Sequence, residues 1–247
     1  MSEPVTAVSR TALVTGGAGG IGSAICRALA ARGSVVVVAD LARADPKKVA
    51  DEIGHEASAV ELDVTDGASV VGLPGCDILV NCAGWDVLKP FVETDDAFMA
   101  KVLEINLAGA MRVTRAVLPG MIERGWGRIV NIASDAGRVG SSGEVVYSGC
   151  KGATIAFAKA FAREVARNNV TVNTVCPGPT DTPAMDAFVG SGEAGQKIRD
   201  AMVRGVPLGR IGVPDDYPGI VAFLASDDAA FITGQTISVS GGLSMHG

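Results

Sequence analysis

Short apolar runs rich in β-branched residues recur along the chain and predict seven β-strands. The runs span residues 11–15, 35–40, 59–63, 77–81, 128–134, 171–176 and 236–240. Most of them are apolar at nearly every position instead of every second one, which is typical of parallel strands that are buried on both faces.

Longer stretches with apolar residues at helical spacing lie between these runs, at residues 22–32, 95–124, 148–168 and 215–226. Strands that alternate with helices favour an α/β class, here a doubly wound Rossmann fold in which helices flank a seven-stranded parallel sheet. The pattern contains no linker and no repeat. We therefore expect residues 1–247 to form a single dinucleotide-binding domain.

Two segments break this alternation. Between Asp63 and Asn81, three glycines and a proline leave room for no more than a turn or two of helix. The other segment, at about 180–212, is rich in glycine but includes an amphipathic piece at 196–203. Because it follows the end of a predicted strand, we expect it to form a mobile substrate lid.

Composition and charge narrow the classes of function. The 247 residues are 48% hydrophobic and carry a net charge of −6 without a lysine or arginine cluster, which argues against a nucleic acid partner. No apolar run approaches the length of a membrane span and the first ten residues are polar, so we expect a cytoplasmic protein without a membrane partner. Five scattered cysteines suit a reducing compartment, and two distant histidines, His55 and His246, predict no metal site.

A glycine-rich loop follows the first predicted strand and opens the first predicted helix. Glycines in this place let a pyrophosphate approach the backbone and the amide groups of the helix N-terminus. The residues expected to contact it are Gly16, Gly19, Gly20, Ile21 and Gly22. Any tight turn from strand to helix could also use some of these glycines, so the prediction depends on the flanking elements.

Asp40 ends the second predicted strand, and Leu41 follows it. A carboxylate at this point accepts hydrogen bonds from both hydroxyls of an adenosine ribose. The same negative charge would repel a 2′-phosphate, so we expect NAD as the cofactor, with NADP less favoured. Arg43 is the residue that could reverse this preference.

Tyr147 and Lys151 stand four residues apart in a predicted helix, so their side chains share one face. A free tyrosine has a pKa of about 10, and a fixed cation nearby lowers that pKa because it favours the phenolate. Ser134 ends the fifth predicted strand. Together these residues predict proton transfer beside a carbonyl or an alcohol, although a tyrosine and a lysine at this spacing also occur by chance on many helices.

With these motifs in this order, the whole chain resembles the single-domain branch of the short-chain dehydrogenase/reductase family. Residues 15–22 match its cofactor loop, and residues 81–84 match its Asn-Asn-Ala-Gly motif, although Cys82 replaces the second asparagine. The cofactor contacts that the resemblance implies beyond the glycine loop come from Asp63, Val64, Asn81, Ala83, Gly84, Tyr147, Lys151, Pro177, Gly178, Thr180 and Thr182.

The resemblance also implies roles in catalysis. Tyr147 would be the general acid/base, Lys151 would lower its pKa and bind the nicotinamide ribose, and Ser134 would bind the substrate oxygen. Asn106 matches a helix asparagine that holds a water molecule for a proton relay. The alternative for Asn106 is a polar cap or kink in a long buried helix. A homotetramer is the assembly that the resemblance implies.

Residues 81–91, 134–152, 176–185 and 231–247 resemble one group within the family, the bacterial 2-hydroxycyclohexanecarboxyl-CoA dehydrogenases. The 3-oxoacyl-carrier-protein reductases lie in the broader neighbourhood, and both groups act on a β-hydroxy or β-keto thioester. We therefore expect an NAD-dependent oxidoreductase that interconverts a secondary alcohol and a ketone in a small-molecule substrate such as an acyl-CoA or an alicyclic compound. The expected substrate pocket comprises Trp85, Ser134, Ser142, Val145, Tyr147 and Met185.

Several alternatives remain open from the sequence. Arg128 fits one of two positions at which carrier-protein reductases place surface arginines, but Asn168 occupies the other, and an acidic chain attracts an acidic carrier poorly. A CoA thioester is therefore favoured over a carrier-bound chain. Beside the pocket, Glu144 and Arg138 are expected to form a local ion pair. A catalytically silent NAD(H)-binding regulator is the alternative from another class of protein.

Overall fold

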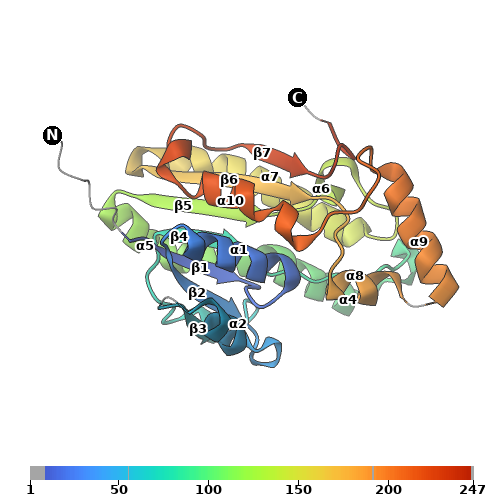
Figure 1. Cartoon of the computed structure of the whole chain (residues 1–247), viewed down its shortest axis with the longest axis horizontal. Coiled ribbons are helices and arrows are strands. Elements are labelled where there is room, and N and C mark those ends of the chain that lie inside the picture. Colours follow the sequence, from blue (N-terminus) through green and yellow to red (C-terminus); the bar gives the residue numbers. More distant parts are fainter. Residues whose placement is uncertain (1–8, 55, 191, 246–247) are drawn as a thin grey trace.

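The computed structural model describes residues 9–54, 56–190 and 192–245. They contain a seven-stranded sheet in the order β3-β2-β1-β4-β5-β6-β7, in which all neighbouring strands are parallel (Figure 1). The strands are β1 (Thr11–Thr15), β2 (Val35–Asp40), β3 (Ser58–Glu61), β4 (Ile78–Asn81), β5 (Gly127–Ile132), β6 (Val170–Pro177) and β7 (Thr236–Val239). The predicted doubly wound fold is confirmed, and the strand ends differ from the predicted ones by no more than two residues.

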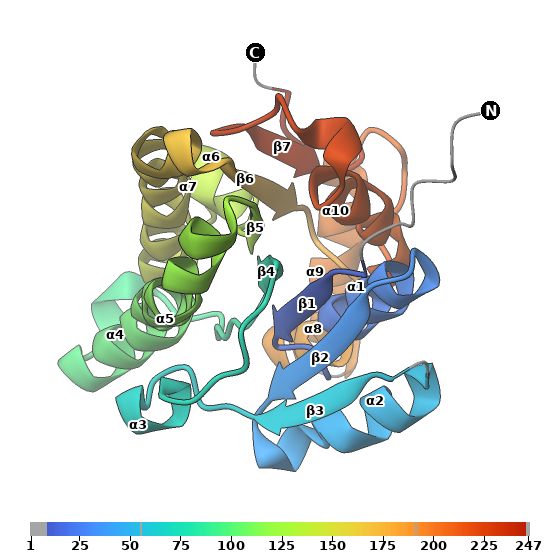
Figure 2. The same ribbon diagram turned by 90° about the vertical axis from the view of Figure 1, so that its left-hand side faces the viewer.

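Helices cover both faces of the sheet (Figure 2). One face carries α1 (Gly20–Ala31), α2 (Pro46–Ile53) and α10 (Pro218–Leu224), and the other carries α4 (Asp96–Leu103), α5 (Gly109–Arg124) and α7 (Val145–Val165). The sequence pattern missed α2 because its composition is mostly polar. Its start signal is local: the Asp45 side chain accepts a hydrogen bond from the amide of Lys48, and Pro46 fills the first helical position.

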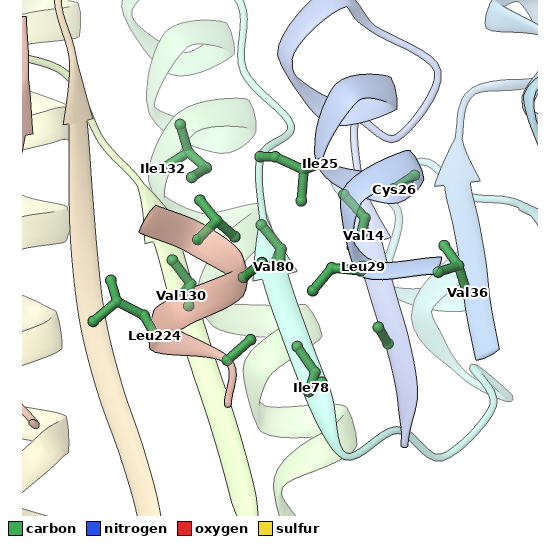
Figure 3. Close-up of a cluster of buried hydrophobic side chains, with 14 of the residues drawn as sticks. Val14, Ile25, Cys26, Leu29, Val36, Ile78, Val80, Val130, Ile132 and Leu224 are labelled. Atoms are coloured by element: carbon green, nitrogen blue, oxygen red, sulfur yellow. The ribbon is translucent and has the colours of Figure 1, made fainter. Parts of the chain in front are cut away.

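The core lies in two layers, one on each face of the sheet. Successive residues of a strand point to opposite faces, so Val14 and Val80 pack toward α1 and α10, while Leu13 and Leu79 pack toward α5 and α7. Figure 3 shows the first layer, where Ile25 and Leu29 of α1 and Leu224 of α10 meet the strands. Burial on both faces explains why the strands are apolar at nearly every position.

The single helix predicted over residues 95–124 is in fact three helical pieces. A π-helical turn, η3 (Glu104–Ala108), separates α4 from α5. Asn106 lies in this turn, and its side-chain amide donates a hydrogen bond to the carbonyl oxygen of Val102 at 3.0 Å. A side chain that bonds the preceding turn competes with the regular backbone ladder, and π-turns of this kind often mark functional sites.

The first irregular segment matches its prediction, and the second contains more helix than the sequence indicates. Between β3 and β4 the chain forms only one short helix, α3 (Gly67–Val70). Residues 180–212 hold α8 (Pro183–Val189) and α9 (Gly192–Gly205), so the second helix is longer than the predicted piece. Thr180 and Gly212 pair as an isolated β-bridge, so the segment starts and ends at one point. In Figure 1, α8 and α9 lie beyond the tips of the strand arrows.

Every helix within the described ranges is too short or too polar to cross a membrane, including the 21 residues of α7. The five cysteines are all free thiols, and four of them are buried. Burial raises the pKa of Cys82, the half-buried one, to about 12. A thiol with so high a pKa is protonated at neutral pH and is a poor nucleophile.

Candidate active site

A large cleft opens at the carboxyl edge of the sheet, where the strand order reverses between β1 and β4. The loops that follow β1 and β4 turn toward opposite faces of the sheet at this point. In open parallel sheets this arrangement forms a crevice between the two loops, and ligands bind in it. The cleft has a volume of about 1850 Å³. Its walls come from the loops that follow β1, β2, β4, β5 and β6 and from the 180–212 segment.

The glycine loop forms one end of the cleft. A Cβ atom on Gly22 would lie 2.0 Å from the carbonyl oxygen of Gly16, and a Cβ on Gly16 would lie 2.8 Å from the Cα of Ala83. Gly16 also has a φ of 66°. Neither position can hold a side chain without a backbone shift, so the loop packs closely and brings the N-terminus of α1 to the cleft. This is a suitable cradle for the phosphates of a dinucleotide.

Asp40 lies beside this loop at the end of β2. Its Oδ2 accepts a hydrogen bond from the amide of Ala18 at 3.0 Å, and its Oδ1 accepts one from the amide of Leu41 at 2.8 Å. The carboxylate is thus fixed between the glycine loop and β2. Arg43 also lines this end of the cleft, as do Asp63 and Val64. Hydrogen bonds from Thr65 and the charge of Arg43 keep the pKa of Asp63 below its usual value.

Tyr147 and Lys151 lie in the first two turns of α7 and face the middle of the cleft. The Nζ atom of Lys151 is 5.4 Å from the centroid of the tyrosine ring, and it donates a hydrogen bond to the carbonyl oxygen of Ile132 at 3.0 Å. The side chain of Ser134 lies beside the phenol of Tyr147 and acts on its pKa. Ser134 stands two residues beyond β5, not at the strand end itself as predicted.

The pKa of Tyr147 moves in the direction opposite to the one that the sequence suggested. Burial raises it well above the usual value, the negative charge of Glu144 adds to this, and the neighbouring side chain of Ser134 acts against it. Burial also lowers the pKa of Lys151. In the protein alone, desolvation therefore outweighs the nearby ammonium, and the phenol holds its proton at neutral pH.

Two predicted residues lie behind the cleft and do not line it. Asn106 is buried; its Oδ1 accepts a hydrogen bond from the amide of Trp85 at 3.1 Å, and its Nδ2 donates to the carbonyl oxygen of Trp85 at 2.7 Å. Asn81 donates to Thr114 and Asn131. Asn106 thus fixes the loop that follows β4, which carries Ala83, Gly84 and Trp85 into the cleft, whereas Asn81 ties the end of β4 to α5 and β5. The remaining predicted cofactor residues line the cleft: Gly19, Gly20, Ile21, Leu41, Pro177, Gly178, Thr180 and Thr182.

The substrate end of the cleft has an apolar wall. Trp85, Ser142 and Met185 line it as predicted, but Val145 does not, and half of its surface is exposed. Further apolar lining comes from Phe188, Ile198 and Met202 in α8 and α9, and from Leu243 near the C-terminus. Nothing in the sequence pattern around Leu243 indicated a place in the site, because only the folded chain brings that segment beside α9.

The prediction of an ion pair between Glu144 and Arg138 is wrong. Arg138 donates hydrogen bonds to the hydroxyl of Ser238 at 3.0 Å and to the carbonyl oxygen of Thr236 at 3.3 Å. Glu144 points elsewhere, where it accepts a hydrogen bond from the hydroxyl of Ser141 and contacts Asp86. The one-turn helix α6 (Ala136–Val139) carries Arg138 toward β7 and away from the cleft.

Two basic residues differ from their sequence-based expectations. Lys101 of α4 was missed: it lines the cleft, with its Nζ atom 3.7 Å from the centroid of the Trp85 ring. Arg128 is not a surface residue, since only 1% of its side chain is exposed. Of the described residues, no three histidine, cysteine or acidic side chains gather as a metal site. His55 and His246 lie outside those residues.

Comparison with known proteins agrees with this geometry. The sequence profile of a family described as enoyl-(acyl carrier protein) reductase matches residues 16–244. An acetoacetyl-CoA reductase from Allochromatium vinosum is 38% identical over 97% of this chain and 100% of its own length. A 3-oxoacyl-[acyl-carrier-protein] reductase from Vibrio cholerae is 37% identical over 96% of this chain and 98% of its own length.

A solved structure is similar over nearly the whole chain. It is a candidate gluconate dehydrogenase from Agrobacterium tumefaciens, with a TM-score of 0.89 and 30% sequence identity over 96% of this chain and 97% of its own. The fold, the glycine cradle, the serine–tyrosine–lysine arrangement and these relatives agree with one another. The chain belongs to the short-chain dehydrogenase/reductase family and is an oxidoreductase that acts on CH–OH and keto groups.

Proposed function

We propose that the protein is an NAD-dependent reductase of β-keto thioesters, which also oxidises the corresponding β-hydroxy thioesters. The observation that carries the proposal is the grouping of Ser134, Tyr147 and Lys151 in one cleft, with the lysine ammonium beside the phenol and a dinucleotide cradle at one end. When bound, a reduced nicotinamide supplies a hydride to the carbonyl carbon.

The side chains of this protein handle the proton. The Ser134 hydroxyl binds the carbonyl oxygen of the substrate, and the Tyr147 phenol donates its proton to that oxygen as the alcohol forms. The raised pKa of Tyr147 keeps the phenol protonated at neutral pH, which suits the direction of reduction. The Lys151 ammonium then stabilises the phenolate that remains. Proton transfer of this kind contributes a factor of about 10²–10⁴ to the rate.

The cofactor proposal, NAD over NADP, is based on Asp40. Its two oxygens are held by the amides of Ala18 and Leu41, so the negative charge cannot turn away from a 2′-phosphate. Arg43 on the same wall is the cation that works against this preference. We infer that the carboxylate prevails because it is hydrogen-bonded directly to the glycine loop through the amide of Ala18.

The substrate proposal is a CoA thioester. Met185, Phe188 and Met202 give the cleft an apolar wall for an acyl group. Relatives named for acetoacetyl-CoA and for carrier-bound 3-oxoacyl groups support the thioester class. The burial of Arg128 and the net charge of −6 speak against docking of an acidic carrier protein.

Oxidation of NADH and of NADPH in the presence of acetoacetyl-CoA and of a cyclic β-ketoacyl-CoA tests the proposal. We expect reduction of at least one thioester, with a kcat/KM that is higher for NADH than for NADPH. NADH binding without turnover of any thioester would favour the silent regulator. A kcat/KM for NADPH that equals or exceeds the one for NADH would contradict the role given to Asp40 and leave the rest of the proposal standing.

A further inference from the structure

Two carboxyl groups from distant parts of the chain meet on the wall of the cleft. Asp86 lies in the loop after β4, Glu144 lies just before α7, and both line the cleft next to Tyr147. The two side chains are in contact. The hydroxyl of Ser141 donates a hydrogen bond to Glu144, whereas the buried Oδ2 of Asp86 has no hydrogen-bond partner among the described residues.

Two neighbouring carboxyl groups disfavour each other's ionisation, and burial adds to this effect. Burial and the neighbouring charge raise the pKa of Asp86 to about 6, and burial also raises that of Glu144. With a pKa of about 6, Asp86 is mostly ionised at neutral pH, so the pair carries negative charge there. Neither carboxyl forms a salt bridge with any residue in the described ranges, and the Oδ2 of Asp86 is shielded from solvent.

This negative charge acts on the reacting centre. Both Glu144 and Asp86 raise the pKa of Tyr147, which means that their field reaches the phenol oxygen. A substrate whose keto oxygen contacts Tyr147 places its neighbouring acid group within the same field. A free carboxylate at that point would be repelled, whereas a thioester or an ester carries no charge and would not be.

Lys151 also lines the cleft, and its positive charge acts on Asp86. Its ammonium is already bound to the carbonyl oxygen of Ile132 and lies beside the Tyr147 ring. Lys101 stands over the Trp85 ring. Neither Lys151 nor Lys101 therefore bonds directly to Asp86 or Glu144 on the substrate side of the pair.

We propose that Asp86 and Glu144 determine substrate specificity: the pair disfavours β-keto acids with a free carboxylate and selects β-keto compounds whose acid group is masked as a thioester or an ester. This inference rests on the proposed function and explains the preference for a masked acid by two residues of this chain. At separations of about 5–10 Å and an effective dielectric constant of about 20, one unit charge changes the binding of another by roughly tenfold or more.

The test compares two small substrates with the same keto group, acetoacetate and its neutral N-acetylcysteamine thioester. The wild type should prefer the thioester. Glu144→Gln keeps the shape and the acceptor for Ser141 but removes the charge. We expect it to raise the ratio of kcat/KM for acetoacetate to kcat/KM for the thioester by roughly tenfold, mainly through the KM of acetoacetate. Asp86→Asn should shift the ratio in the same direction and provides a second variant.

Glu123→Gln is the matched control, because it removes one negative charge from an exposed position on α5 outside the cleft. Its ratio should equal that of the wild type. An unchanged ratio in both Glu144→Gln and Asp86→Asn, with thioester reduction intact, would overturn the inference and leave the proposed function standing. A wild type that reduces neither the CoA thioesters nor this thioester would overturn both.

Discussion

At the scale of single residues, burial sets the protonation states in the site. Tyr147 and Lys151 share one environment, and the loss of water moves their pKa values in opposite directions because it disfavours the charged form of each. Asp86 follows the same rule, since burial and the nearby Glu144 keep it protonated to a higher pH than usual. At neutral pH the phenol of Tyr147 is therefore protonated before a substrate arrives, whereas Asp86 is mostly ionised.

The raised pKa of Asp86 leads to a prediction about stability. The pKa of Asp86 is about 6 in the folded protein against an ordinary value of 3.8. The folded state thus binds the proton more tightly, and the stability that this gives at low pH is lost as the pH rises from about 4 to about 6. Asp86→Asn removes the penalty of ionisation, so the free energy of unfolding should rise by roughly 1–3 kcal/mol at pH 8.

Urea denaturation of wild type and Asp86→Asn at pH 4 and pH 8 measures this effect. The variant should be more stable than the wild type at pH 8 and show little gain at pH 4. A gain of equal size at both values of pH would mean that the effect comes from packing and not from ionisation.

At the scale of elements, parallel strands could be located from the sequence and irregular helices could not. Strands buried on both faces leave an unbroken apolar run, so the ends of β1 and β2 match their prediction. The π-turn at Glu104–Ala108 left no trace in the sequence pattern, because the turn and the two helices on either side of it are all helical and keep one amphipathic pattern. It depends on hydrogen bonds of Asn106 to Val102 and Trp85, which only the folded chain brings together.

The turn from β1 to α1 has no room for a side chain at Gly22. The Cβ of Gly22→Ala would lie 2.0 Å from the carbonyl oxygen of Gly16, so the loop must shift. We expect the free energy of unfolding to fall by about 1–3 kcal/mol and NADH binding to weaken at least about tenfold.

Gly219→Ala is the control, since Gly219 lies in α10 with nothing within 4 Å of an added Cβ. This variant should be neutral, or more stable by up to about 1 kcal/mol. Thermal unfolding and titration of NADH fluorescence would check both. Normal NADH binding by Gly22→Ala would show that the cradle does not need its close packing.

At the scale of the whole molecule, the parallel sheet explains why residues far apart in the sequence meet in one cleft. The carboxyl ends of parallel strands lie at one edge, so Asp40 and Ser134 could be assigned to a common site without a structure. Contacts between separate loops could not be predicted in this way. The pair of Asp86 and Glu144 and the approach of Leu243 to α9 depend on the course of each loop, which no periodicity encodes. The homotetramer remains a prediction, with light scattering as its measurement.

Arg128 holds distant segments together at the opposite edge of the sheet. Its guanidinium donates hydrogen bonds to the carbonyl oxygens of Gly127 at 2.9 Å, Asn169 at 3.3 Å and Ser226 at 3.3 Å. Arg128→Ala would leave these acceptors, of which that of Gly127 is buried, without their donor and would create a void. The free energy of unfolding should fall by about 2–4 kcal/mol, as measured by urea denaturation.

Arg167→Ala is the control for this variant, because Arg167 is exposed near the same edge. Its free energy of unfolding should match that of the wild type. If Arg128 served a carrier protein, Arg128→Ala would instead lose activity toward a carrier-bound substrate and keep its stability. That outcome would contradict the structural role.

Turnover by Tyr147→Phe is the most direct test of the central claim, that the phenol of Tyr147 transfers the proton while a hydride reaches the keto carbon. The variant keeps the ring beside Lys151 and removes only the hydroxyl that contacts Ser134. On a thioester that the wild type reduces, we expect kcat to fall by about 10²–10⁴, with the Kd for NADH unchanged. A kcat close to that of the wild type would contradict the account.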